Sequence, residues 1–160
     1  QNLSAFSGTL RTDGVGRFVV NLAPDSRVWF FAVKDGFVQP CGASVDARSD
    51  QRIDVEMVTA SSLDSPSPPL PQSAADPTTT GTIFETTAAG RMPVVGADIY
   101  VQNAYTELAS TRSDRRGAFY LCRLPNHVGL LVRKEGYGDG ATGPFDGSRA
   151  QVLEIELKRR

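Results

Sequence analysis

The sequence predicts an all-β protein of two tandem antiparallel β-sandwich domains, the first of which lacks its N-terminal strands. Three short motifs recur in the same order about one hundred residues apart, which indicates two copies of one small unit. Apolar and polar residues alternate along short runs that end at turn residues, and no longer window has helical spacing. The motif pairs are GRFVV at 16–20 with GAFYL at 117–121, KDGF at 34–37 with KEGY at 134–137, and IDVEM at 53–57 with LEIEL at 153–157.

A proline-rich stretch divides the two copies. Residues 61–80 contain five prolines among Ser and Thr. Because proline fixes φ and removes a main-chain donor, neither a helix nor a central strand is expected there. The sequence therefore predicts a partial sandwich domain over 1–60, a linker over 61–80 and a complete sandwich domain over 81–160.

The second unit carries the clearest strand patterns. Its apolar residues occupy every second position in four runs, the period of a strand with one buried face. Glu154 and Glu156 take the alternate positions of the last run, where we expect them to face solvent. The expected inward residues are Ala97, Ile99 and Val101; Phe119 and Leu121; Val128, Leu130 and Val132; and Leu153, Ile155 and Leu157.

These motifs resemble those of the carboxypeptidase regulatory-like domain, a prealbumin-like (transthyretin-like) β-sandwich of about seven strands. The resemblance covers 81–157 and, in the first unit, 11–57. It implies a fold more than an activity. Domains of this kind accompany zinc carboxypeptidases, outer-membrane receptors and surface proteins, and the zinc chemistry belongs to a separate domain. The motifs are GTI at 81–83, PVVGADIYV at 93–101, TRSDRRGAF at 111–119, LP at 124–125 and KEGY at 134–137.

The first unit departs from this pattern at its start. It has no counterpart of the GTI strand or of the Pro-x-x-Gly-Ala strand, so a core face and strand edges would be exposed. We expect these strands upstream in a longer parent chain; the alternative is that another segment or a partner supplies them. No signal peptide precedes Gln1, which predicts a mature form or an excised fragment.

Composition argues against two classes of partner. With 17 basic and 18 acidic residues the net charge is −1, without the basic field of a nucleic-acid-binding protein. No apolar run is long enough to cross a bilayer, so we expect no membrane insertion. Cys41 and Cys122 occupy non-equivalent places in the two repeats. Two separate thiols are the favoured interpretation, and a bridge between the units is the alternative.

Residues for catalysis, metals and cofactors are sparse, and we predict none of these sites. His127 is the only histidine, it lies in a predicted turn, and no Cys-x-x-Cys accompanies it. Residues 138–143 match Gly-x-Gly-x-x-Gly, but Pro144 follows where a dinucleotide-binding helix would begin.

The acidic residues fit structural roles. The pairs Asp54/Glu56 and Glu154/Glu156 each lie on one strand face, so they cannot act as acid and base across a cleft. The aspartates of the turns lack the Asp-x-Asp-x-Asp-Gly spacing of a calcium loop. These aspartates are Asp13, Asp114, Asp139 and Asp146.

An aromatic pair in the first unit is the candidate interaction surface. If Val28, Phe30 and Ala32 are buried, strict alternation places Trp29, Phe31 and Val33 on the opposite face. Trp29 and Phe31 could stack on a sugar ring or meet a protein partner. The alternative is that the linker or the neighbouring domain covers them.

Together these features predict a non-catalytic, extracytoplasmic spacer and protein-interaction module of a larger bacterial protein. Its compartment is periplasmic, outer-membrane-associated or secreted, as the resemblance implies. Its partners are a protein or neighbouring domains of the same chain. A carbohydrate-binding module that uses Trp29 and Phe31 is the alternative.

Overall fold

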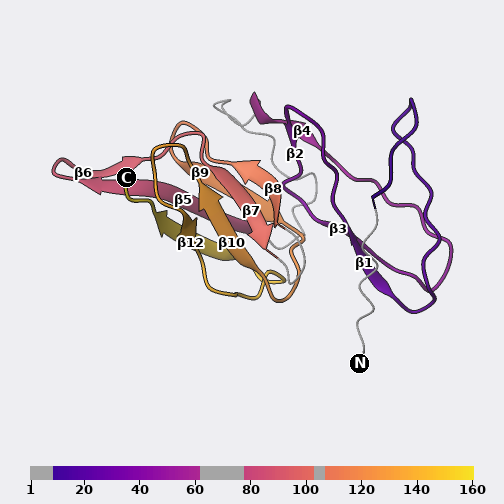
Figure 1. The fold of residues 1–160 in the computed structure, drawn as a ribbon. Helices are drawn as coiled ribbons and strands as arrows, with labels where there is room; N and C mark the ends of the chain where they lie inside the picture. The colour runs from indigo at the N-terminus through magenta and orange to yellow at the C-terminus, as the bar shows by residue number, and fades with distance from the viewer. Residues whose placement is uncertain (1–8, 62–77, 103–106) are drawn as a thin grey trace.

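The computed structural model describes residues 9–61, 78–102 and 107–160, and within these ranges the protein is all-β. Figure 1 shows a C-terminal sandwich (residues 78–160) beside an N-terminal segment (residues 9–61), which lies on the side away from β6 and the C-terminus. Most of the predicted linker lies outside the described residues. Strand β5 begins at Thr78, three residues before the predicted boundary at 81.

Two four-stranded sheets form the C-terminal sandwich. In one, β5 pairs with β12, β6 and β9; in the other, the order is β11-β10-β7-β8. All pairs are antiparallel except β5 with β12, which run parallel. The strands are β5 (Thr78–Thr87), β6 (Gly90–Pro93), β7 (Asp98–Gln102), β8 (Glu107–Arg112), β9 (Ala118–Cys122), β10 (Gly129–Arg133), β11 (Gly140–Ala141) and β12 (Gln151–Glu156).

The core lies between these sheets and follows the predicted alternation. Ten of the eleven residues predicted to face inward are buried, and the remaining one, Leu153, is partly buried against the same cluster. Glu154 and Glu156 are exposed, as predicted. The cluster has thirteen buried members: Ile83, Val94, Ala97, Ile99, Val101, Phe119, Leu121, Leu124, Val128, Leu130, Val132, Ile155 and Leu157.

The N-terminal segment has much less regular structure. Strand β1 (Arg27–Phe30) pairs with β3 (Ala43–Asp46), and β2 (Phe37–Val38) pairs with β4 (Val58–Thr59), both antiparallel. The apolar residues of its last motif alternate with exposed acidic ones but are half-buried at most. These residues are Ile53, Val55 and Met57.

The turns of the two parts nevertheless share their hydrogen bonds. Asp13 Oδ1 accepts the main-chain N–H groups two and four residues later, at 2.9 and 2.8 Å. Asp114 Oδ1 accepts N–H groups at the same spacing, both at 2.8 Å. Gly16 and Gly117 close these turns with φ of 79° and 72°, a region that other residues rarely adopt. The repeated sequence thus forms one turn geometry twice.

A second turn recurs in the same way. The carbonyl of Gly36 accepts the N–H of Ala60 at 2.9 Å, and that of Gly136 accepts the N–H of Arg160 at 3.1 Å. Both glycines have positive φ, of 77° and 83°. Pairs of residues one hundred positions apart therefore make equivalent contacts in the two parts of the chain.

Candidate functional site

The two parts of the chain meet at the outer edge of β9. The N–H of Gly42 donates to the carbonyl of Cys122 at 2.9 Å, and the N–H of Cys122 donates to the carbonyl of Pro40 at 3.0 Å. Pro40, Cys41 and Gly42 therefore form a short parallel strand addition to β9. This addition also covers an edge of the C-terminal sandwich, and an unpaired strand edge would invite association with other chains.

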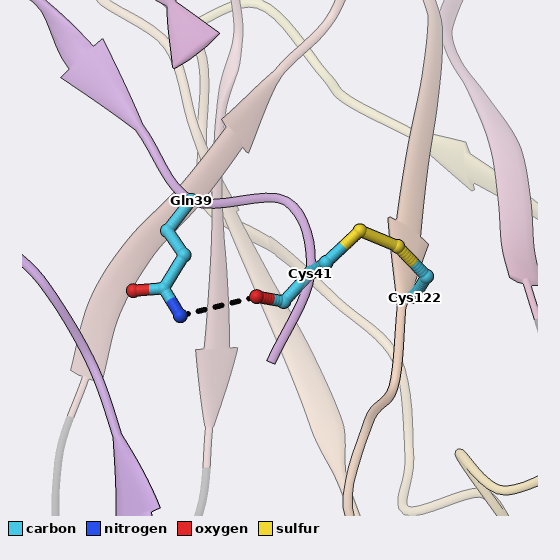
Figure 2. Close-up of a disulfide and its surroundings, with 3 residues drawn as sticks. All are labelled: Gln39, Cys41 and Cys122. Carbon is cyan, nitrogen blue, oxygen red and sulfur yellow. Dashed lines mark hydrogen bonds between the residues drawn. A yellow bond between two sulfur atoms is a disulfide. The ribbon is translucent and has the colours of Figure 1, made fainter. Parts of the chain in front are cut away.

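A disulfide between Cys41 and Cys122 fixes this contact covalently. Their Cα atoms lie 4.4 Å apart and 81 residues separate them in sequence. The interpretation as two separate thiols is wrong, and the alternative of a bridge between the units is correct. The cysteines occupy non-equivalent places because the bridge joins one copy to the other rather than the same two strands within each copy. Figure 2 shows Cys122 at the end of its strand with Cys41 facing it.

Residues 40–42 pair with β9 and not with β1, and the side chain of Gln39 fills the position beside β1 that they leave open. Its side-chain oxygen accepts the N–H of Ala32 at 2.6 Å, and its side-chain nitrogen donates to the carbonyls of Phe30 and Cys41 at 3.1 Å each. In the C-terminal sandwich, the groups equivalent to those of Phe30 and Ala32 lie on the edge that pairs with β11. The buried amide of Gln39 thus replaces main-chain pairing while residues 40–42 bond to β9 (Figure 2).

Trp29 packs against the docked segment. A Cβ placed on Gly42 would lie 2.9 Å from Trp29 Cζ3 and would collide with the carbonyl oxygen of Arg123. The indole ring therefore lies beside the strand addition, and only a residue without a side chain fits between the ring and the end of β9. Trp29 is half-buried in this position.

Burial along the aromatic stretch differs from the prediction. Phe31 is half-buried, but so are the residues predicted to be buried, and Val33 is 82% exposed. Phe30 faces the Phe18 ring, with centroids 5.5 Å apart. Buried and exposed side chains do not alternate strictly here for two reasons. The face predicted to be buried is only partly covered, and Gly42 covers part of the opposite face. The residues predicted to be buried are Val28, Phe30 and Ala32.

A small apolar contact joins the two parts next to the disulfide. Val38 of β2 and Tyr120 of β9 are 6% and 9% exposed and pack together. Val58 and Ala60 lie against them. Burial raises the pKa of the Tyr120 hydroxyl, and the nearby charge of Glu56 adds to the shift. The docking contact is thus apolar and covalent, with paired main-chain groups beside it.

Most of the residues considered for chemistry are exposed. His127 is exposed, and residues 138–143 contain the short strand β11 rather than the start of a helix. Asp54 and Glu56 are exposed, but the stretch that carries them is not a strand, contrary to the prediction, because regular pairing there is limited to β4 at Val58–Thr59. Within the described parts of the chain, no three His, Cys, Asp or Glu side chains gather as metal ligands do.

The turn aspartates are engaged by their own surroundings. Asp13 and Asp114 each accept two main-chain N–H groups, as above. Asp139 pairs with Arg133 at 3.3 Å. Asp146 accepts the N–H of Ser148 at 3.0 Å and its hydroxyl, and these bonds lower the pKa of the Asp146 carboxyl. These oxygens support turns, as turn chemistry predicts.

An open hollow near the C-terminus holds one strong ion pair. Arg159 Nε and Nη2 donate to the two carboxylate oxygens of Glu85, both at 2.8 Å. These bonds hold the pKa of Glu85 below its ordinary value. Each charge satisfies the other, which leaves neither for a ligand. The hollow is lined by Glu85, Thr86, Thr87, Glu156, Leu157, Lys158 and Arg159.

Among the residues that the structure describes, no helix is long and apolar enough to span a membrane. No protein-family model matches the chain, and no curated protein matches it. Among solved structures, the chain is similar to GBS52, the minor pilin of the Gram-positive pathogen Streptococcus agalactiae. The identity is 14% and the TM-score 0.40, over 93% of this chain and 66% of the pilin chain.

Proposed function

We propose that the chain is a non-catalytic, extracytoplasmic spacer and protein-interaction module of a larger bacterial protein. The disulfide between Cys41 and Cys122 is the observation that carries this proposal. Disulfides persist in oxidising compartments and are rare in the cytosol. The bond therefore supports a periplasmic, outer-membrane-associated or secreted location.

The same bond supports a spacer. A flexible linker alone would leave two small domains free to reorient. Here a covalent bond, two main-chain hydrogen bonds to Cys122 and the apolar contact of Val38 with Tyr120 join the N-terminal segment to one edge of the sandwich. We infer that residues 1–60 and 81–160 act as one mechanical unit across the linker of 61–80.

The recurring turns support tandem carboxypeptidase regulatory-like domains as the identity of the two units. Asp13 and Asp114 make the same pair of hydrogen bonds, and the carbonyls of Gly36 and Gly136 accept the N–H groups of Ala60 and Arg160 in the same way. The placement of the ionisable groups among the described residues supports a binding role without catalysis. Most of these groups lie exposed or are bonded within turns and ion pairs such as Glu85–Arg159.

Small-angle X-ray scattering tests the spacer role directly. The oxidised chain should give a narrow distribution of interatomic distances with a well-defined maximum dimension. The Cys41→Ser/Cys122→Ser chain should give a broader one, because only weak contacts then hold the two parts together. An oxidised chain that scatters like a freely jointed pair of domains would contradict the proposal.

Location and the carbohydrate alternative need separate measurements. Thiol alkylation in intact cells should find both cysteines blocked in the exported protein and should find free thiols if it resides in the cytosol. A glycan panel with a Trp29→Ala control tests the alternative that Trp29 and Phe31 stack on sugar. Binding that depends on Trp29 would favour a carbohydrate-binding module over the spacer.

A further inference from the structure

The disulfide changes the route that tension takes through the chain. Cys41 and Cys122 are 81 residues apart in sequence, and their Cα atoms lie 4.4 Å apart. When the chain is pulled from the side before Cys41 and the side after Cys122, the S–S bond carries the tension directly from one cysteine to the other. Residues 42–121 lie in the covalent loop between them, so their backbone is not stretched.

The covalent loop holds a large part of the structure. It contains β5 to β8, all of β9 except its last residue, and β3 and β4 of the N-terminal segment. Because an extended chain spans about 3.3–3.6 Å per residue, the bond withholds about 27–29 nm of chain from extension. This is about half of the length that the chain of 160 residues could reach.

Tension enters the C-terminal sandwich near one end of β5 and leaves it near the other. Cys122 lies opposite Thr78, the first residue of β5, because β9 runs antiparallel to β5. Glu156 lies opposite Phe84, because β12 runs parallel to β5. Residues 79–82 of β5 pair with both β9 and β12, so these strands lie on opposite edges of β5. Tension therefore pulls β9 and β12 in opposite directions along β5.

This direction of pulling stresses all the hydrogen bonds of each ladder together. The bonds run across the strands, so sliding one strand along another strains the whole ladder at once. Separating two strands from one end would break the same bonds one after another. The ladders are five and six residue pairs long, over 118–122 and 151–156. The three strands should therefore resist sliding more strongly than separation from one end.

The middle of this three-stranded unit is closely packed. Gly81 lies opposite Phe119 of β9 and Leu153 of β12. A Cβ on Gly81 would lie 2.5 Å from the Phe119 ring and 2.7 Å from the carbonyl oxygen of Leu153, so the ring covers the glycine. Ile83 and Ile155 are 0% and 4% exposed on the core side. Their burial keeps water, which would compete for the hydrogen bonds, away from that face.

The chain that follows β12 has further attachments to β5. The N–H of Leu157 donates to the carbonyl of Phe84 at 2.8 Å. The side chain of Arg159 donates to both carboxylate oxygens of Glu85, each at 2.8 Å. Tension from the C-terminal side must break these contacts before it can slide β12 along β5.

The N-terminal segment has a much shorter ladder on the same route. Strand β1 lies before Cys41 and is therefore under tension, and it pairs with β3 over only four residues. Its side chains are half-buried at most. We expect this pairing to separate at a lower force than the ladders of β5.

We propose that the chain bears tension: the disulfide limits its extension, and β9, β5 and β12 form a mechanical clamp that holds the force. This inference rests on the proposed spacer role and adds to it the property that lets a spacer transmit force between its neighbours. The N-terminal segment yields first, and the clamp then carries the tension. Residues 42–121 cannot be drawn out while the bond is intact.

Single-molecule force spectroscopy of the full chain, held by tags at its two ends, tests the limit on extension. The Cys41→Ser/Cys122→Ser chain should reach a final extension about 27–29 nm greater than that of the oxidised chain. This difference is measured on the extended chain, so it holds whether or not the variant folds. An oxidised chain that extends as far as the double variant would overturn the limit.

A second direction of pulling tests the clamp in the oxidised protein. Ala89 is exposed at the tip of the hairpin of β5 and β6, at the same end of β5 as Glu156. An azide-bearing amino acid in place of Ala89 supplies an attachment point there. Pulling between this point and the C-terminal end separates β12 from β5 one bond after another. The sandwich should then yield at a severalfold lower force than when the chain is pulled from its two ends.

The same variant pulled from its two ends is the control and should yield at the force of the parent chain. Equal forces in the two directions would overturn the clamp. This result is distinguishable from failure of the spacer role, because X-ray scattering of the oxidised chain decides without applied force whether the two parts form one unit.

Discussion

Gln39 Oε1 accepts the main-chain N–H of Ala32 at 2.6 Å, so a side chain completes the pairing that backbone provides elsewhere in this fold. The same amide donates to the carbonyls of Phe30 and Cys41, and it is 6% exposed. It therefore links β1 to the segment that carries the disulfide. The packing of the two parts depends on a residue with no equivalent partner in the C-terminal sandwich.

Gln39→Ala should destabilise the N-terminal segment by about 2 kcal/mol or more, because three polar main-chain groups lose their partner and buried unsatisfied groups are costly. Urea unfolding followed by Trp29 fluorescence measures the change. Gln51→Ala is the matched control, since Gln51 is exposed and makes one hydrogen bond to Asp46. Equal effects of the two substitutions would show that the amide network is not structural.

Gly42→Ala should loosen the docked segment. The new methyl group would collide with the carbonyl oxygen of Arg123 and lie 2.9 Å from the Trp29 ring, and such overpacking costs about 1–3 kcal/mol. We expect a shift in Trp29 emission and a lower unfolding midpoint. Gly14→Ala is the control, because no atom of the described chain lies within 4 Å of its Cβ position. A neutral Gly42→Ala substitution would contradict the observed packing.

Removal of the disulfide should cost more than either substitution. A cross-link that closes a loop of 81 residues removes chain entropy from the unfolded state, worth about 4 kcal/mol in the loop-closure treatment. The Cys41→Ser/Cys122→Ser chain should therefore unfold at a clearly lower temperature than the oxidised chain. Added reductant should lower the oxidised chain to the same midpoint and leave the double variant unchanged. A single midpoint for all samples would mean that the bond does not restrain the unfolded chain.

Alternation predicted the C-terminal sandwich well because its strands have covered faces. Ile99, Leu130 and Ile155 are buried where a period of two places them. The parallel pairing of β12 with β5 was not predictable in this way, because the same alternation suits a strand running in either direction.

The docking contact could not be predicted from the repeat. Comparing the copies identifies what they share, whereas Gln39, Cys41 and Gly42 act where the copies differ and where one copy meets the other. The unmatched cysteines were the available signal, and their pairing depends on a distance between units that sequence spacing does not contain. The partial burial of Trp29 depends on the same contact, since Gly42 lies beside its ring.

Ser113→Ala and Thr12→Ala form a matched pair that reports which copy has its strands. Ser113 loses bonds to Val94 and Ala97 in a buried site, which should cost about 1–3 kcal/mol. Thr12 is exposed, so its substitution should change stability by less than about 0.5 kcal/mol. Thermal unfolding of both variants gives the comparison. A large effect at Thr12 in the isolated chain would mean that its hydroxyl already holds a strand.

Glu85→Gln should change the acid dependence of stability. Hydrogen bonds from Arg159 hold the pKa of Glu85 below its ordinary value. A carboxyl with a depressed folded-state pKa stabilises the protein above its unfolded pKa, and this contribution is lost as pH falls through the folded pKa. The variant should thus be less stable at neutral pH, and the two proteins should converge in acid. Urea midpoints measured from about pH 7 to about pH 2 show this difference. Glu154→Gln, at an exposed ion pair with Arg91, is the control, and its urea midpoints should follow the same pH dependence as those of the parent chain. Asp146 is present in all three proteins and contributes equally to each curve. A Glu85→Gln curve parallel to that of the parent chain would exclude the Glu85–Arg159 pair as the source of acid sensitivity.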